Sequence, residues 1–318
     1  MTYSSLLIIH QGALGDVVLT FPAIIGLRKK FSRVDVLCQS QLGKLAAALG
    51  LAEKWYSLEA ACFATLFSEQ VDEKIKDILA GYSTILLFSF ACDLKKSISQ
   101  ITDSQCFRIP PRPPALDKIH VAEFLFKNLI DCGLLETAGS NDKSFTLQGK
   151  QTPRTGRPID TSKILIHPGS GSKRKRWPLA QFLKLAYVLK KRGLQPQFVC
   201  GPAESDLKDE LRNQNRQVHN LSELRDLVDL LQSAGGYIGN DSGVSHLAAF
   251  LGLPSAVIFG PADPVRWKPL GPRIQIVRPE LDCNPCFEIE SENCVQPGCL
   301  ADASLESVLK AFEHAYKR

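Results

Sequence analysis

Glycine-containing turns and basic residues occur together in the second half of this 318-residue chain. Residues 168–176, 201–204 and 240–243 each lie between an expected strand and an expected helix, and the first of these turns carries four consecutive cations, 173–176. A helix N-terminus offers unpaired backbone N–H groups and the positive end of the helix dipole, and both attract anions. Three such turns in one domain therefore predict a ligand that bears phosphate.

Two carboxylates stand next to turns of this kind. Glu204 ends the second turn, and a carboxylate beside a nucleotide site commonly accepts hydrogen bonds from ribose hydroxyls. In the first half, Asp16 follows a turn that contains Gly12 and Gly15 and precedes an expected helix. There it is either a favourable charge at a helix N-terminus or, if the other domain binds a nucleotide, a general base. His10, at the end of the first expected strand, fits the core and a cleft equally well.

Other phosphate-binding and hydrolytic motifs fit poorly. A Gly-x-Gly-x-x-Gly fingerprint is missing, because Arg174 stands where the third glycine would follow Gly169 and Gly171. A Gly-x4-Gly-Lys-[Ser/Thr] motif is missing too. Ser242 is outside any Gly-x-Ser-x-Gly elbow, and His246 follows it too closely on the same expected helix to form a catalytic triad. These features disfavour a nicotinamide oxidoreductase, a P-loop ATPase and a serine hydrolase.

The chain contains 10 cysteines, of which four cluster near the C-terminus. These are Cys283, Cys286, Cys294 and Cys299. A Cys-x2-Cys pair is half of a zinc site, whereas the second pair is more loosely spaced. Structural zinc, reduced thiols and a disulfide are therefore all open interpretations. The other six cysteines are scattered, most of them in apolar contexts where cysteine packs as a small core residue.

Composition and charge narrow the function classes further. The chain is 44% hydrophobic and 22% charged, as expected for a globular protein, and its net charge is only +5. Positive charge is concentrated between residues 154 and 176, which suits a small anionic ligand better than a nucleic acid. The N-terminus lacks a secretory signal, and the longest apolar stretch, 247–259, is shorter than a membrane span. We therefore expect a cytoplasmic protein that does not bind nucleic acid.

Strand-like and helix-like patterns alternate along both halves of the chain. In the first half, strands are expected at 6–10, 34–38 and 85–90, and helices at 17–31 and 120–130. In the second half, strands are expected at 164–167, 197–200, 237–238 and 255–259, and a last helix at 304–317. This order predicts an α/β fold with two doubly wound parallel sheets. The Gly- and Pro-containing stretch 148–162 reads as a linker, so we expect domains at 1–155 and 156–302 and a C-terminal helix at 303–318.

Taken together, these motifs resemble glycosyltransferase family 9, the lipopolysaccharide heptosyltransferases, nearly from end to end. The matching pieces are Leu14-Gly15-Asp16 with Thr20 and Pro22; His167-Pro-Gly, Lys175 and Trp177-Pro178; Gly201 and Glu204; Asp241-Ser-Gly243 with His246-Leu-Ala-Ala; Phe259-Gly-Pro with Asp263-Pro-x-Arg266; and Cys283-x-Pro-Cys286 with Cys299-Leu300. Each piece is modest alone, and their order and spacing make the resemblance specific.

The resemblance implies a GT-B fold whose two Rossmann-like domains face a cleft, with the C-terminal helix crossing back to the first domain. It implies an inverting, metal-independent transfer of heptose from a nucleotide diphosphate-heptose, usually ADP-heptose, to an inner-core sugar on lipid A. No cofactor is expected, and we expect a monomer.

The resemblance also assigns roles to single residues of this chain. Asp16 would deprotonate the acceptor hydroxyl, and Lys175 would hold the diphosphate together with Ser170. Glu204 would meet the ribose. The pocket for the heptose and the phosphates would be lined by Asp241, Ser242, Gly243 and His246, while Gly15 and Gly169 would belong to the substrate-binding turns.

Two features depart from the family pattern. The run 172–176 is more cationic than expected, and the stretch 89–96 keeps Asp-Leu but lacks the usual glutamine and arginine. The stretch 89–96 lies in the half of the chain expected to bind the acceptor, so its departure from the family pattern affects the expected identity of the acceptor most. Because a lipid acceptor requires a membrane, Phe31 and the cations Arg28, Lys29, Lys30 and Arg33 are a candidate patch for peripheral contact with the inner membrane. The alternative functions are a protein that binds a nucleotide sugar without catalysis and a family member that uses a different sugar donor or acceptor.

Overall fold

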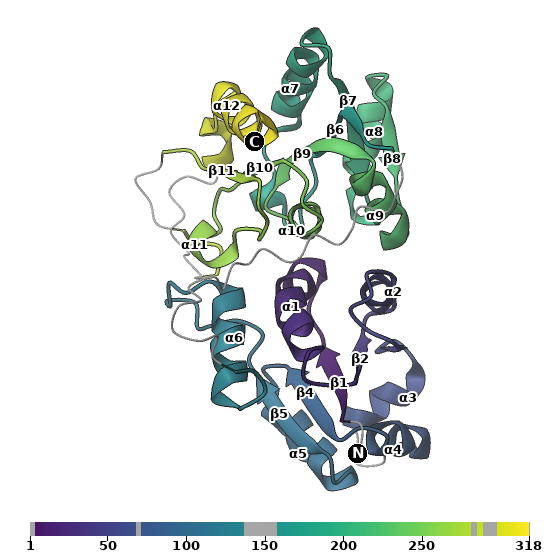
Figure 1. The fold of residues 1–318 in the computed structure, drawn as a ribbon. Coiled ribbons are helices and arrows are strands. Elements are labelled where there is room, and N and C mark those ends of the chain that lie inside the picture. The colour runs from purple at the N-terminus through teal and green to yellow at the C-terminus, as the bar shows by residue number, and fades with distance from the viewer. Residues whose placement is uncertain (1–3, 68–70, 137–157, 281–284, 289–297, 318) are drawn as a thin grey trace. The chain divides into compact units, whose positions relative to one another are not determined.

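The computed structural model describes residues 4–67, 71–136, 158–280, 285–288 and 298–317. The chain divides into two compact units, Met1–Phe145 and Thr146–Arg318. Each unit is built around one parallel sheet (Figure 1). The α/β prediction is therefore confirmed. The predicted domain boundary lies among residues that are not described.

The first unit contains a five-stranded sheet in the order β3-β2-β1-β4-β5. Its strands are β1 (Ser5–His10), β2 (Arg33–Cys38), β3 (Trp55–Ser57), β4 (Thr84–Phe88) and β5 (Gln105–Ile109). Its helices are α1 (Leu14–Leu27), α2 (Ser40–Ala48), α3 (Ala61–Ala64), the 3-10 turn η1 (Thr65–Phe67), α4 (Glu73–Ala80), α5 (Cys92–Ile101) and α6 (Val121–Asp131).

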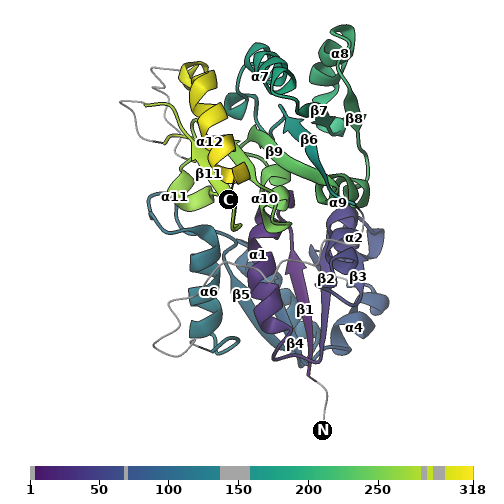
Figure 2. The ribbon, with the colours of Figure 1, turned by 45° about the horizontal axis from the view of Figure 1, so that its top comes forward.

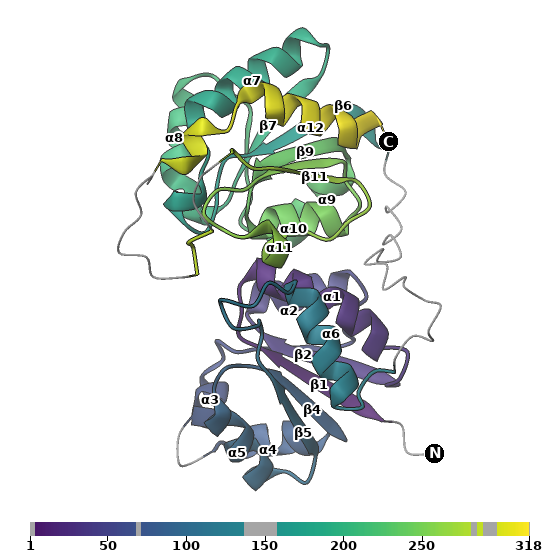
Figure 3. The ribbon, with the colours of Figure 1, turned by 90° about the vertical axis from the view of Figure 1, so that its left-hand side faces the viewer.

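Helices cover both faces of this first sheet. Helices α3, α4 and α5 pack on one face through a core that includes Leu7, Ile85 and Ile98, while α1 and α6 pack together on the other (Figure 3). The central strands β1 and β4 are mostly apolar because both of their faces are buried, whereas the edge strands β3 and β5 are only partly buried. Helix α1 runs from Leu14 to Leu27, so it begins and ends about one turn earlier than the predicted helix at 17–31, and Pro22 lies inside it.

The second unit contains a six-stranded sheet in the order β11-β10-β9-β6-β7-β8. Its strands are β6 (Asp160–His167), β7 (Gln195–Cys200), β8 (Val218–Asn220), β9 (Ala234–Asn240), β10 (Ser255–Ile258) and β11 (Ile274–Val277). Its helices are η2 (Lys173–Lys175), α7 (Leu179–Lys191), η3 (Pro202–Glu204), α8 (Ser205–Asn213), α9 (Leu224–Gln232), α10 (Gly243–Phe250), α11 (Pro264–Trp267), η4 (Cys299–Asp302) and α12 (Leu305–Lys317).

Helices α7 and α12 cover one face of the second sheet, and α9 and α10 lie on the opposite side (Figure 3). Helix α7 ends as its sequence predicts, because Gly193 takes a φ of 79° just beyond the last turn. Parallel strands point their carboxyl ends to one edge of the sheet, so the turns after β6, β7, β9 and β10 gather there.

The C-terminal helix belongs to the second unit. Val308 and Phe312 on α12 are buried in the core formed with α7, and α12 also contacts β10 and β11 (Figure 2). The apolar face of this helix is covered by the second sheet, and its crossing back to the first domain stays a prediction.

Candidate functional site

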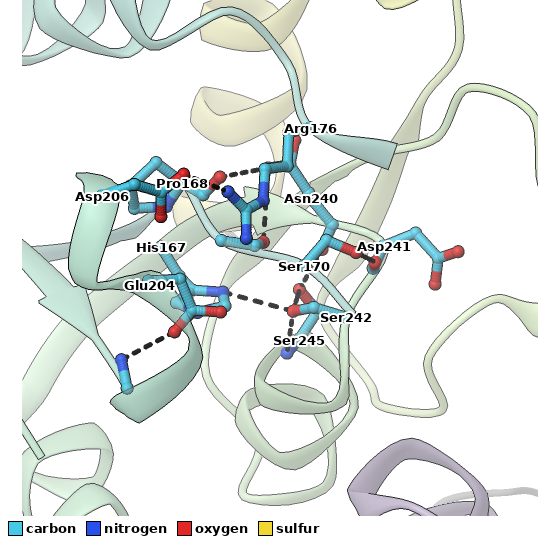
Figure 4. Close-up of polar contacts among 12 residues, drawn as sticks. His167, Pro168, Ser170, Arg176, Glu204, Asp206, Asn240, Asp241, Ser242 and Ser245 are labelled. Carbon is cyan, nitrogen blue, oxygen red and sulfur yellow. Dashed lines mark hydrogen bonds and ion pairs between the residues drawn. The ribbon is translucent and has the colours of Figure 1, made fainter. Parts of the chain in front are cut away.

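The basic turn after β6 is tied to the end of β9 by one buried amide. Asn240, which is fully buried, accepts a hydrogen bond from the Trp177 N–H (3.0 Å) and donates one to the Pro168 carbonyl (2.8 Å) (Figure 4). These bonds fix both ends of the turn. Asn240 was visible in the sequence as part of a turn, but its role as an anchor depends on β6 and β9 being neighbours in the sheet.

Lys175 and Asp241 form an ion pair within the second unit. The Lys175 Nζ lies 2.8 Å from the Asp241 Oδ2 and 3.9 Å from the centre of the Phe287 ring. Burial raises the pKa of Asp241, and the Lys175 ammonium opposes that rise. The Ser170 hydroxyl donates to the Asp241 carbonyl oxygen at 2.7 Å. The predicted residues Ser170, Lys175 and Asp241 are therefore brought together, and the Lys175 side chain remains 19% exposed.

Glu204 is held against the glycine turn. Its Oε2 accepts the Gly201 N–H at 2.8 Å and lies 4.0 Å from the His167 Nε2. Burial acts to raise the pKa of Glu204, but the contacts with His167, Gly201 and Arg176 outweigh it, so the pKa lies below its ordinary value. A Cβ on Gly169 would stand 2.5 Å from the Glu204 Oε1. Gly169 thus leaves the space that the carboxylate occupies.

The N-terminus of α10 contains the remaining predicted residues. Ser242 caps the helix by accepting the Ser245 N–H, and its hydroxyl also lies 3.3 Å from the His167 Nδ1. Gly243 is the first helical residue, and His246 is buried one turn later. Figure 4 shows His167 between Glu204 and Ser242. His167 links two predicted site residues, a role that its motif alone did not reveal.

In the first unit, Asp16 lies in the first turn of α1 at the carboxyl end of β1. It is half-buried, and its Oδ2 accepts the Ala13 N–H at 3.1 Å. Gly15 lies beside it within the same helical turn. The predicted charge at a helix N-terminus is therefore present, and the role of Asp16 as a base stays a prediction.

Comparison with known proteins identifies the family. The sequence model of glycosyltransferase family 9 (heptosyltransferase) matches residues 94–295, more than half of the chain. The chain belongs to glycosyltransferase family 9.

Individual family 9 relatives agree with this assignment. Lipooligosaccharide heptosyltransferase 2 of Campylobacter jejuni is 29% identical over 167 residues, which are 49% of this chain and 51% of that protein. The chain spans between a third and about half of the length of the curated relatives it matches.

Solved structures show the fold. A glycosyl transferase family 9 protein from Veillonella parvula has a TM-score of 0.74 and 17% identity, covering 100% of this chain and 98% of the other. E. coli heptosyltransferase WaaC with ADP has a TM-score of 0.73 and 16% identity, covering 98% and 99%. The predicted GT-B fold is confirmed.

A short segment of this family 9 chain, residues 285–288, is anchored beside the Lys175–Asp241 pair. The Cys286 and Phe287 N–H groups both donate to the Pro261 carbonyl, at 2.9 and 3.0 Å. Glu288 binds the buried Arg266 through both carboxylate oxygens, at 2.7 and 3.2 Å. Phe287 and Glu288 were not predicted, because nothing in the sequence indicates that this segment returns to the turn after β6.

Two of the four cysteines of the predicted site fall outside the described residues. Cys283 and Cys294 lie there, whereas Cys299 is buried and the Cys286 Sγ accepts a hydrogen bond from the Arg174 guanidinium at 3.3 Å. The described ranges contain no group of three or more side chains suited to hold a metal ion. Whether the four cysteines bind zinc, are reduced thiols or form a disulfide stays open, as in the sequence-based prediction.

The predicted membrane patch is incomplete. Phe31 is buried, so it cannot supply the exposed apolar group that the patch requires. Lys30 donates to the Gly133 carbonyl, and Arg33 pairs with the buried Asp35 at 3.0 Å. The sequence pattern was misleading here because Phe31 follows α1 and turns into the core. Among the described residues, no helix is long and apolar enough to cross a membrane.

Proposed function

We propose that this protein is an inverting, metal-independent glycosyltransferase that moves heptose from a nucleotide diphosphate-heptose, with ADP-heptose as the expected donor, to the lipopolysaccharide inner core. The observation that carries the proposal is the Lys175–Asp241 pair at the carboxyl edge of the second sheet, beside the N-terminus of α10. Membership in family 9 and the names of the relatives support this substrate class.

In the proposed reaction, the second unit binds the donor. Lys175 and the N–H groups at the start of α10 hold the diphosphate, while Glu204 accepts hydrogen bonds from the ribose. An ammonium has three N–H donors, so Lys175 can contact Asp241 and phosphate oxygens together. The leaving diphosphate gains negative charge as its bond to the sugar breaks, and a fixed cation stabilises this charge more in the transition state than in the ground state. Asp241 and His246 line the heptose.

The first unit supplies the base. The acceptor hydroxyl oxygen attacks the anomeric carbon of heptose, the bond from that carbon to the phosphate oxygen breaks, and the electron pair leaves with the nucleotide diphosphate. The hydroxyl proton passes to the Asp16 carboxylate. A single displacement of this kind inverts the configuration, and a positioned base contributes about 10²- to 10⁴-fold in rate.

The acceptor is a lipid in this proposal. We infer that the protein acts as a monomer at the cytoplasmic face of the inner membrane. Sedimentation with anionic vesicles tests this part separately. Binding that disappears at high salt supports the membrane contact, and no binding at low salt rejects it.

Our test of the reaction uses ADP-heptose and a deacylated inner-core acceptor, with nucleotide release and product mass as readouts. We expect turnover in the presence of EDTA, and Asp16→Asn should abolish it while the affinity for ADP stays within about twofold. Glu73→Gln, which removes another first-turn carboxylate of the same unit, is the matched control and should stay active.

Two outcomes would contradict the proposal. Tight donor binding without turnover would identify a protein that binds a nucleotide sugar without catalysis. Equal loss of transfer and of ADP affinity in Asp16→Asn would show that Asp16 is structural.

A further inference from the structure

A buried histidine lies next to Asp16. His10 ends β1, is 3% exposed, and packs against the Phe88 ring on β4 with ring centres 5.5 Å apart. Its Nδ1 accepts the Gly12 N–H at 2.9 Å. An accepting nitrogen carries no proton, so the neutral ring holds its proton on Nε2. Burial lowers the pKa of His10 to about 4, which keeps the ring neutral near pH 7.

Gly12 is packed between His10 and Asp16. A Cβ on Gly12 would stand 2.6 Å from the His10 Cε1 and 2.7 Å from the Asp16 Cβ, closer than real atoms allow. The three residues therefore form one tightly packed unit. A displacement of the imidazole can be transmitted to Asp16 through Gly12, because Gly12 lies in close contact with both side chains.

Two consecutive backbone N–H groups of this turn are bound by the two side chains. His10 accepts from Gly12, and Asp16 accepts from Ala13. The turn is thus held from the strand side by the imidazole and from the helix side by the carboxylate. If the first bond is lost, the Ala13 N–H can rotate with the turn, and the direction of the Asp16 carboxylate changes with it.

We propose that His10 is a positioning residue that holds Asp16 in its reactive orientation through the Gly12 N–H. This inference rests on the proposed function, in which Asp16 is the base. The imidazole does not touch the reacting groups; it fixes the turn. A misplacement of about 1 Å in a reacting group can cost on the order of 100-fold in rate, so this hydrogen bond can matter without any direct contact.

The test compares two replacements of His10. Asparagine places an oxygen near the position of Nδ1 and can still accept the Gly12 N–H, whereas leucine fills the space without an acceptor. We expect His10→Leu to lower kcat by about 10- to 100-fold, and His10→Asn to restore it to within about threefold of wild type. KM for the donor and the affinity for ADP should not change, because those contacts belong to the second unit.

A second readout does not depend on transfer. We would titrate the Asp16 carboxyl by ¹³C NMR in the wild type and in both variants, with thermal unfolding as the check on folding. The pKa of the Asp16 carboxyl should differ from its wild-type value in His10→Leu and should equal that value again in His10→Asn. Gly12→Ala, which must push His10 and Asp16 apart, should shift it as well.

Failure of this inference can be told apart from failure of the proposed function. If wild-type protein shows no transfer, the proposed function fails, and the Asp16 titration still decides whether His10 positions the carboxylate. If the two His10 variants behave alike in kcat and in the titration, or if each loses activity only in proportion to its unfolded fraction, His10 is a packing residue and the inference is overturned.

Discussion

The polar groups at the carboxyl edges of the two sheets are held in different ways. In the second unit, buried charges are paired across elements distant in sequence, as in Lys175 with Asp241 and Arg266 with Glu288. In the first unit, Asp16 is half-buried and is oriented by a backbone N–H three residues before it. A buried charge requires a partner, whereas a base that exchanges protons must stay accessible. The difference fits a second unit that stabilises a fixed anion and a first unit that accepts a proton.

The largest effect in the second unit should follow removal of the paired cation. Lys175→Met should lower the transfer rate by about 10²- to 10³-fold, as loss of one fixed charge-stabilising donor does, and should leave Asp241 buried without its cation. Steady-state kinetics with the nucleotide diphosphate-heptose measures the rate. Lys173→Met removes an exposed cation of the same turn and should have little effect. Equal losses in both variants would mean that the turn acts through its summed charge and not through the pair.

A smaller effect should come from crowding the Glu204 carboxylate. Gly169→Ala places a methyl group 2.5 Å from the Glu204 Oε1, so the carboxylate must move, and we expect KM for the donor to rise about tenfold, as loss of one hydrogen bond to a charged group would cause. Gly171→Ala is the matched control, because nothing lies within 4 Å of its Cβ. If both variants bind donor equally well, Glu204 does not contact the nucleotide.

The smallest effect concerns how Glu204 and Asp241 change the free energy of unfolding at acidic pH. The folded pKa of Glu204 lies below its ordinary value of 4.5, so the stability it contributes is complete above about pH 4.5 and is lost as the pH falls through the folded pKa. The raised pKa of Asp241 acts in the opposite direction, since protonation there relieves a buried charge. Between pH 6 and pH 3, Glu204→Gln should therefore lose less unfolding free energy than wild type, and Asp241→Asn should lose more.

Urea unfolding at each pH measures this difference, with Glu210→Gln on the exposed side of α8 as the control. If the free energy of unfolding changes equally with pH in wild type and in all three variants, these carboxylates are solvated like surface groups. In that case the contrast between the two units would disappear.

Local patterns predicted those parts of the fold that depend on short-range physics. The buried strands follow from apolar runs such as 6–10, and the end of α7 follows from a glycine in the left-handed conformation. The start of α1 was misplaced by one turn, because Leu14 and Gly15 were read as part of the glycine turn, although Leu14 lies three residues before Val17 and continues the apolar spacing of the helix. Phe31 was misread because exposure cannot be read from a residue type alone.

The sequence by itself determined that the chain has two parallel α/β units, that the glycine-containing turn with four consecutive cations lies in the second, and that one carboxylate follows a glycine turn in the first. Only the tertiary structure decided which of these residues touch. Lys175 meets Asp241 because β6 and β9 are neighbours in the sheet, and Phe287 meets Lys175 because its segment binds the Pro261 carbonyl. Contacts of this kind depend on strand order and on the path of the chain, which residue types and spacings do not encode locally.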